Sequence, residues 1–423
     1  MDSRNWLARA TGAKPEEIRA VCWSFAYFFC LLSSYYVLRP LRDEMGVAGG
    51  VRNLQWLFTA TFLVMLAAVP LYGAVVARLP RKRFIPVVYH FFVLNLAVFW
   101  FLLFFQIEKI IVARVFFVWI SVFNLFAVSV FWTFMADTFS TEQGKRLFGF
   151  IAAGGSAGAL AGPAVTVWLA VPLGVTNLLL VAAALLECAV LCVRQLEVKA
   201  HAGEPPAKAQ ALGGGWLAGV ALLFRSPYLG AIAAWVGLLS IAATFLYFEQ
   251  ASIIAAASDD PAVRTRMFAS VDLAVGLLTI VVQFFATGRL IAHFGVGAAL
   301  ALVPVVFMAG FAGLAAAPTL AVVVAFQALQ RTANFAVSNP AREVLFTAVS
   351  REEKYKAKNV IDIVVVRGAD AAGGWFFAAL RSLFELTAVT IAAIGIAAIG
   401  LVVSLALGRA IEKGRGSSAA PSP

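Results

Sequence analysis

The sequence RQLEVKAHAGEPPAKAQ, residues 194–210, is the one long hydrophilic stretch in the middle of a strongly apolar chain. Six long apolar runs precede it and six follow it. Each run holds about 20 residues, which is the length that a helix needs to cross the hydrocarbon core of a bilayer. We therefore expect an all-α integral membrane protein with about twelve transmembrane helices, arranged in two pseudo-symmetric six-helix lobes.

The expected spans set the domain organisation of the chain. The apolar runs cover residues 18–38, 54–77, 84–106, 110–137, 147–170, 172–193, 228–250, 267–291, 296–317, 319–340, 359–380 and 385–408. The predicted parts are a cytoplasmic N-terminal segment (1–17), an N-terminal lobe (18–193), a cytoplasmic linker (194–227) with an interfacial helix near 213–225, a C-terminal lobe (228–408) and a disordered cytoplasmic tail (409–423).

The composition excludes several classes of protein. Hydrophobic residues make up 62% of the chain and charged residues 13%, whereas soluble domains carry about 25% charged residues. The net charge of +11 does not indicate a nucleic-acid partner, because the basic residues lie in short loops between apolar runs. Four cysteines inside apolar runs argue against a disulfide framework. The three histidines form no cluster, so we expect neither a metal site nor a cofactor.

The basic residues also predict the orientation in the membrane. If the N-terminus is inside, the loops on that side carry about three times as many lysines and arginines as the loops on the other side. We therefore expect both termini in the cytoplasm and the protein in a bacterial inner membrane. The partners expected are the lipid bilayer and a small anionic substrate, and the expected oligomeric state is a monomer.

Four charged residues lie at the inner edges of four spans. Arg42 follows the first span, Asp137 is late in the fourth, Glu249 closes the seventh and Arg342 is late in the tenth. A charge at membrane depth costs about 2.5–3.5 kcal/mol on insertion scales, so it is usually paired, water-facing and functional. We expect substrate-binding or gating roles, with Arg42–Glu249 bridging the lobes when the outer gate is shut and Asp137–Arg342 when the inner gate is shut. Alternatively, each side chain reaches its nearest interface without a partner.

Two further arginines lie inside predicted spans. Arg331 and Arg367 have no acidic residue four positions away on their own helices, although Asp370 follows Arg367 by three. We expect both arginines in an aqueous cavity, where a guanidinium can hold a phosphate or carboxylate through two hydrogen bonds. Asp272, Asp362 and Asp370 are the candidate acidic partners.

The end of the second span and the loop after it carry a glycine and a basic cluster, and a related glycine lies near the end of the eighth span. A glycine lets two helices approach closely, and basic side chains anchor helix ends to lipid phosphates. This pattern resembles the signature loop of the major facilitator superfamily, with Ala77 where that family usually carries aspartate. The resemblance implies a conformational role for Gly73, Arg78, Arg81, Lys82 and Gly288.

The fifth span holds small residues at four-residue spacing. Gly158, Gly162 and Pro163 are typical of closely packed membrane helices, and they partly resemble the fifth-helix motif of drug/proton antiporters. A phosphate-binding loop is excluded because no Gly-Lys-Ser/Thr follows and no strand precedes. We assign these three residues to the conformational motif.

Longer stretches resemble the ATP/ADP translocases of plastids and intracellular bacteria. The resemblance is strongest at residues 36–43 (YVLRPLRD), 131–163 and 339–374. In that family, charged residues of the first, fourth, seventh and tenth helices serve nucleotide exchange. The resemblance implies the same role for the four charges named above, an ATP/ADP antiport activity and a nucleotide substrate.

Three functions follow from these observations. The first is a secondary transporter of an anionic metabolite, working by exchange or with proton coupling. The second is a proton-coupled exporter of amphipathic small molecules. The third, a membrane enzyme acting on lipid, is the least favoured, because Ser156 in its glycine run has no nearby histidine and no other nucleophile–base pair is evident.

Overall fold

The computed structural model describes residues 13–78, 81–196 and 216–418. Side chains are described in these ranges except at 71–78, 81–84, 141, 216–219, 291–292, 351–352, 355 and 412–418. Within the described ranges the regular structure is helical throughout, and no strand occurs. The predicted N-terminal segment, the linker and the tail therefore lie partly outside the described residues.

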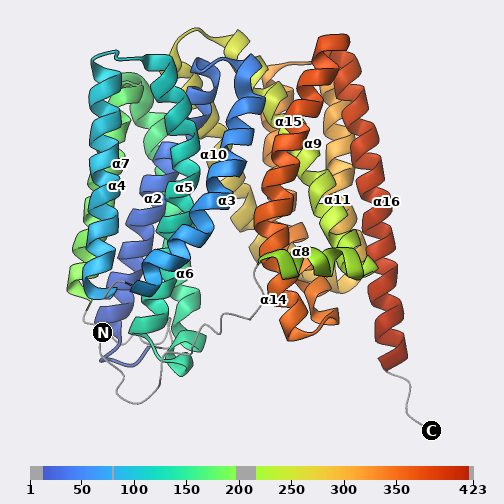
Figure 1. The fold of residues 1–423 in the computed structure, drawn as a ribbon, viewed down its shortest axis with the longest axis horizontal. Coiled ribbons are helices and arrows are strands. Elements are labelled where there is room, and N and C mark those ends of the chain that lie inside the picture. The colour runs from blue at the N-terminus through green and yellow to red at the C-terminus, as the bar shows by residue number, and fades with distance from the viewer. Residues whose placement is uncertain (1–12, 79–80, 197–215, 419–423) are drawn as a thin grey trace. The chain divides into compact units, whose positions relative to one another are not determined.

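The described helices follow the predicted apolar runs along the chain (Figure 1). In the first half they are α2 (Ile18–Ala48), η1 (Val51–Asn53), α3 (Leu54–Arg78), α4 (Arg81–Phe104), α5 (Lys109–Thr138), α6 (Thr141–Leu173) and α7 (Val175–Gln195). In the second half they are α8 (Trp216–Arg225), α9 (Pro227–Ala257), α10 (Pro261–Val282), η2 (Gln283–Thr287), α11 (Gly288–Ala316), α12 (Leu320–Thr332), η3 (Ala333–Ser338), α13 (Asn339–Leu345), η4 (Phe346–Ala348), α14 (Arg351–Val360), η5 (Ile361–Val365), α15 (Val366–Leu383) and α16 (Leu386–Ser418).

Twelve helical segments among the described residues are long and apolar enough to cross a membrane. The prediction of an all-α protein with twelve such helices is therefore confirmed. Several helices extend beyond the apolar runs that predicted them. The first continues to Ala48 although its apolar run ends near residue 38, because Leu41 and Met45 are still buried and the charged residues between them find partners.

The chain folds into two compact units. The first comprises the described residues of Met1–Gly49, Ala67–Lys208 and Ser258–Leu273. The second comprises those of Gly50–Leu66, Ala209–Ala257 and Ala274–Pro423. The start of α3 thus belongs with the second half of the sequence, and the start of α10 belongs with the first half.

Small residues on α6 bring that helix against α2 in the first unit. A Cβ atom added to Gly162 would lie 2.7 Å from Ser33 O and 2.7 Å from Tyr36 Cβ. A Cβ added to Gly158 would collide with the carbonyl oxygen of Phe29. No side chain fits at either position, so the spacing of the two glycines allows the backbones to approach closely.

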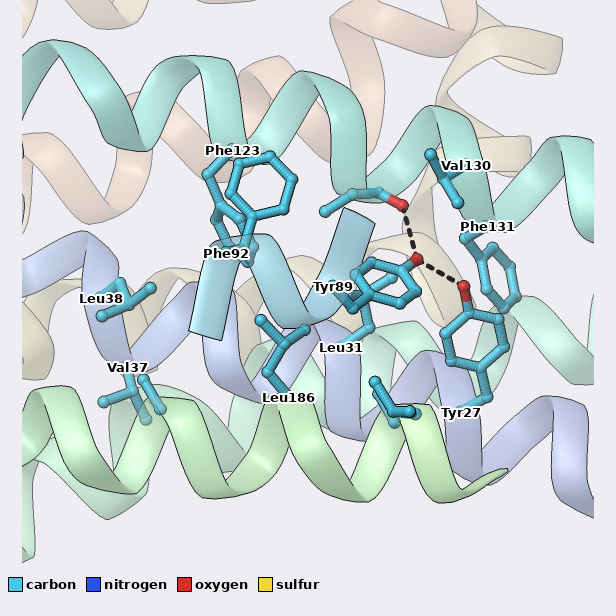
Figure 2. Close-up of a cluster of buried hydrophobic side chains, with 14 of the residues drawn as sticks. Tyr27, Leu31, Val37, Leu38, Tyr89, Phe92, Phe123, Val130, Phe131 and Leu186 are labelled. Carbon is cyan, nitrogen blue, oxygen red and sulfur yellow. Dashed lines mark hydrogen bonds between the residues drawn. The ribbon is translucent and has the colours of Figure 1, made fainter. Parts of the chain in front are cut away.

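A buried polar group lies inside the aromatic core of the first unit (Figure 2). The hydroxyl groups of Tyr27 and Tyr89 are hydrogen-bonded to each other, and the Tyr89 hydroxyl donates to the carbonyl oxygen of Ala127 at 3.3 Å. Phe131 packs edge-on against Tyr27, with ring centroids 4.9 Å apart. These bonds tie α2, α4 and α5 together, because a buried hydroxyl without a partner would cost free energy.

Glycines also allow a close helix contact in the second unit. Gly297 of α11 faces Gly408 of α16, and a Cβ on Gly297 would lie 3.1 Å from Gly408 Cα. Trp235 of α9 donates from Nε1 to Ser404 Oγ at 2.7 Å, which joins α9 to α16. The short helix α8 runs crosswise to α9 and α11 (Figure 1), as expected for a helix that lies along a membrane surface.

Among the described residues, three π-helical segments interrupt spans of the second unit. Two of them, η2 and η3, touch each other: Thr287 Oγ1 donates to Ala336 O at 2.7 Å, and Gln283 Nε2 donates to Phe335 O at 3.4 Å. The third, η5, contains Asp362. A π segment leaves backbone carbonyls free for other donors, and such segments occur frequently at functional sites.

Candidate functional site

Arg42 lies within α2 and has partners in the first unit. Its Nη1 is 3.6 Å from Asp43 Oδ1, and its guanidinium lies over the ring of Phe117 of α5 at 4.2 Å from the centroid. The side chain is 19% exposed. An arginine that stacks on an aromatic ring keeps its N–H donors at the edge of the guanidinium plane, where they can form hydrogen bonds.

A second arginine in the same stretch pairs with an aspartate of α10. Arg39 Nε lies 3.7 Å from Asp272 Oδ2, and the aspartate side chain is 3% exposed. From the sequence, Asp272 is a candidate partner for Arg331 or Arg367. The structure pairs it with Arg39, an arginine that the sequence assigns to a loop; its pairing with Arg331 or Arg367 stays a prediction.

The best-formed ion pair in the first unit also joins α2 to α10. Arg264 donates from Nε to Glu44 Oε2 at 2.8 Å and from Nη2 to Glu44 Oε1 at 2.6 Å. The two side chains are 11% and 2% exposed, and Arg264 Nη1 also bonds to Ser258 O at 3.0 Å. The sequence did not predict this pair. The only indication of it is Glu44, a carboxylate that lies just past an apolar run and therefore needs a partner if it is buried.

Asp137 is half-buried in the last turn of α5, which ends at Thr138. The chain then turns into α6 through a capping box in which Ser140 accepts from Gln143 N and the Gln143 side chain accepts from Ser140 N. Gln143 Nε2 also donates to Glu17 Oε1 at 2.8 Å. The end of α5 is thereby attached to the start of α2.

Glu17 is the centre of this attachment. It accepts from Lys14 N at 2.8 Å and from Arg146 Nη2 at 3.1 Å, in addition to Gln143. Burial alone would raise the pKa of the Glu17 carboxyl, but these hydrogen bonds and the Arg146 charge outweigh burial and lower it. The carboxylate therefore stays ionised and holds the N-terminus of α2 against α6.

Glu249 is 1% exposed, and its partner in the second unit is a hydroxyl group. Thr390 Oγ1 of α16 donates to Glu249 Oε1 at 2.8 Å. The next residue, Gln250, accepts from Gln327 Nε2 of α12 at 2.7 Å. Two successive polar residues of α9 are thus buried and bonded to two different helices.

Arg342 follows the π segment η3 and pairs with a residue of η5. Its Nη2 lies 3.2 Å from Asp362 Oδ1, while its Nε is buried without a hydrogen bond among the described residues. Its neighbour Glu343 forms an ion pair with Lys358 of α14. The guanidinium therefore keeps a donor for a further acceptor.

Arg331 and Arg367 lie on two other helices of the second unit. Arg331 is half-buried in the last turn of α12. Arg367 Nη1 is 3.3 Å from Asp370 Oδ2, which confirms the prediction that this aspartate partly satisfies it. Asp362, the other predicted acidic partner, pairs with Arg342 instead.

The predicted gate pairs remain predictions. Arg42 and Asp137 belong to the first compact unit, and Glu249 and Arg342 belong to the second. Within its own unit, Arg42 contacts Asp43, Glu249 bonds to Thr390 and Arg342 pairs with Asp362.

The conformational motif is described only in part. The side chains of Gly73, Arg78, Arg81 and Lys82, at the end of α3 and the start of α4, lie outside the described residues. Gly288 opens α11, and nothing lies within 4 Å of a Cβ placed there, so no close helix contact depends on it. Pro163 follows Gly162 inside α6, and Gly158 and Gly162 both contact α2.

No group of three or more potential metal ligands occurs among the described residues.

Comparison with known proteins identifies the fold. No protein-family model matches the sequence, and no curated protein matches it. Among solved structures, a single-residue mutant of the nucleoside transporter NupG matches with a TM-score of 0.69 at 16% identity, covering 92% of this chain and 99% of that chain. A bacterial homologue of the human lysosomal transporter Spinster matches with a TM-score of 0.64 at 12% identity, covering 95% and 99%.

A third match is the human organic anion transporter MFSD10 (TETRAN), with a TM-score of 0.56 at 18% identity, covering 92% of this chain and 100% of that chain. These likenesses cover nearly the whole of each chain, although few residues are identical. The fold of this protein is therefore the twelve-helix fold of major facilitator transporters.

Proposed function

We propose that this protein is a secondary transporter that moves a small organic anion across a membrane by alternating access. The observation that carries the proposal is the buried pair Arg264–Glu44, with Arg39–Asp272 beside it. Both pairs join the first span to the eighth, which come from the two halves of the sequence. Such pairs are costly to bury, and they are well attested as switch elements.

These two pairs are candidates for an outer gate. With both termini inside, α2 runs outward, so Glu44 lies at its outer end. Arg264 and Glu44 form a closed, two-bond contact that must open if the helices separate, and water must then replace both bonds. The predicted pairs Arg42–Glu249 and Asp137–Arg342 belong to the same scheme, as contacts made in one state and lost in the other.

An anionic substrate fits the arginines near these contacts. Arg42 presents its guanidinium edge beside Phe117, and Arg342 retains a buried Nε–H donor. An anion that binds one of these groups better in one state than in the other shifts the balance between the states. A nucleotide exchanged in ATP/ADP fashion is the narrower form of this proposal, and it rests on the resemblance of residues 36–43, 131–163 and 339–374.

Proton-coupled export of amphipathic molecules is the second candidate. Glu249 favours it, because a buried carboxyl group bonded to a threonine hydroxyl is suited to taking up and releasing a proton. The close contact of Gly158 and Gly162 with α2 is compatible with either candidate.

Measurements of uptake into proteoliposomes distinguish anion exchange from proton-coupled export. For anion exchange, labelled ADP or a labelled dicarboxylate enters faster when the same anion is inside, and a protonophore has little effect. For proton-coupled export, a pH gradient drives uptake and Glu249→Gln abolishes it. Absence of both effects for every anion tested would overturn the proposed function.

Neutralising the two arginines tests their part in transport. Arg42→Ala and Arg342→Ala should each reduce anion uptake on the order of tenfold or more, because each removes a charged hydrogen-bond donor. Arg266→Ala is the control, since Arg266 is exposed on α10 and has no ion pair among the described residues. Normal uptake by both variants would show that these arginines do not bind the substrate.

A further inference from the structure

A cavity of about 810 Å³ lies wholly within the second unit, at the ends of three helices. Its lining comes from η1 and the start of α3, from the last turns of α9 and from the last turns of α15. This volume falls in the range of small-molecule sites, about 300–1,000 Å³. None of the residues assigned above from the sequence lines it.

Two arginines supply the charge of the cavity. Arg52 and Arg381 both line it, and its described lining contains no carboxylate. Neither arginine forms an ion pair with a carboxylate among the described residues, and Arg381 Nη1 bonds to the carbonyl oxygen of Phe384 at 3.2 Å. Arg39 and Arg264, by contrast, are paired with carboxylates. The cavity therefore has an excess of positive charge.

Aromatic side chains form an apolar wall of the same cavity. Phe248 and Phe377 line it with ring centroids 5.2 Å apart, and both are more than 90% buried. Gly374 leaves space for the Phe248 ring, since a Cβ at this glycine would lie 3.2 Å from Phe248 Cζ and 3.2 Å from Gln55 Cα. The cavity thus combines two cationic groups with an apolar wall.

We infer that this cavity binds a soluble organic anion that carries a planar or apolar body, with Arg52 and Arg381 holding its acidic group and Phe248 and Phe377 contacting its body. The inference rests on the proposed function, for which the site is a vestibule that captures the anion before transport. With both termini inside, the three helix ends that form the cavity face the outer side.

Glu249 connects this vestibule to the charges inside the spans. Its carboxylate is on the residue next to Phe248, which lines the cavity. A negative charge at this position repels an anion in the cavity. Removing the Glu249 charge should therefore strengthen anion binding in the vestibule.

Binding of three probes to the full chain in nanodiscs of zwitterionic lipid tests the inference. Labelled ADP carries both a ring system and an anionic group, pyrophosphate carries only the anionic group and adenosine only the ring system. Arg52→Gln combined with Arg381→Gln should weaken ADP binding on the order of tenfold or more. Phe377→Leu should weaken ADP binding but not pyrophosphate binding, and Glu249→Gln should tighten ADP binding.

The matched control is Arg266→Gln, an exposed arginine that does not line the cavity, and all variants should show the wild-type elution profile and melting temperature. Three results would overturn the inference: wild-type protein that binds no ADP, equal loss in Arg266→Gln, or no loss in the double variant. Phosphatidylglycerol that displaces ADP in the wild type and is retained less by the double variant would identify a lipid headgroup as the occupant, which also overturns it.

The outcomes distinguish this site from the transport proposal. If ADP binds and depends on Arg52 and Arg381 but no anion is transported in proteoliposomes, the site stands and the proposed function fails. If anion transport is present and the Arg52→Gln, Arg381→Gln double variant binds ADP normally, the proposed transport function is supported and the proposed binding site in the cavity is wrong.

Discussion

Glu44 and Arg264 show how two charged side chains can be buried together. Their two N–H···O bonds run in parallel, so the planar guanidinium and the carboxylate satisfy each other's geometry. Lysine in place of Arg264 would keep the charge but lose one of the two bonds. The buried carboxylate of Glu249, by contrast, accepts a hydrogen bond from the neutral hydroxyl group of Thr390, which offsets the cost of burying its charge far less than a guanidinium does.

Breaking the buried pair from either side should destabilise the protein strongly. Glu44→Gln or Arg264→Gln should each cost about 3–5 kcal/mol in free energy of unfolding, because the remaining charge stays buried. Arg264→Gln combined with Glu44→Gln should recover part of that loss, since neither charge is left alone. Thermal unfolding in detergent measures the effect, with Arg266→Gln as the control, and a double variant worse than both singles would contradict the pairing.

The lowered pKa of Glu17 predicts a dependence of stability on pH. A carboxyl whose folded pKa lies below its ordinary value of 4.5 stabilises the folded state above that value, and the contribution is lost as the pH falls through the folded pKa. The melting temperature of the wild type should therefore fall more steeply below pH 4.5 than that of Glu17→Gln. Parallel curves for the two proteins would show that Glu17 contributes nothing.

At the scale of elements, glycines decide which helices lie closest together. Gly158 and Gly162 allow α6 to touch the backbone of α2, and Gly297 and Gly408 do the same for α11 and α16. Other glycines in helices face open space, Gly149 and Gly288 among them. The same residue type therefore has very different consequences at different positions.

Alanine substitutions should reveal this difference. Gly158→Ala and Gly162→Ala should lower the melting temperature and impair transport, because the added methyl group collides with the α2 backbone. Gly149→Ala should be neutral or slightly stabilising, since its Cβ has space and alanine favours a helix. Equal effects at Gly149 and Gly158 would contradict the packing described for α6.

At the scale of the whole molecule, twelve apolar helices and an uneven distribution of basic residues predict the topology. A reporter fused after Val198 or at Pro423 should report the cytoplasm. One inserted near Asp260 should report the outer side. The opposite result at either fusion site would invert the orientation, and with it the assignment of Glu44–Arg264 to an outer gate and of the arginine-lined cavity to an outer vestibule.

The sequence by itself determined the all-α membrane fold, because a run of about 20 apolar residues has no better environment than a bilayer. It also identified Gly158 and Gly162 as packing residues, and it predicted the Arg367–Asp370 contact, since residues three apart on a helix are neighbours. These are local properties, and local spacing is enough to predict them.

Only the tertiary structure decided which charges meet. Arg39 pairs with Asp272, Arg264 with Glu44 and Arg342 with Asp362, and no spacing along the chain indicates these pairs. The same holds for Arg52 and Arg381, which lie far apart in sequence yet line one cavity. The physical reason is that ion pairing acts over a few ångströms in space, so the packing of helices selects the partner from many chemically equivalent candidates.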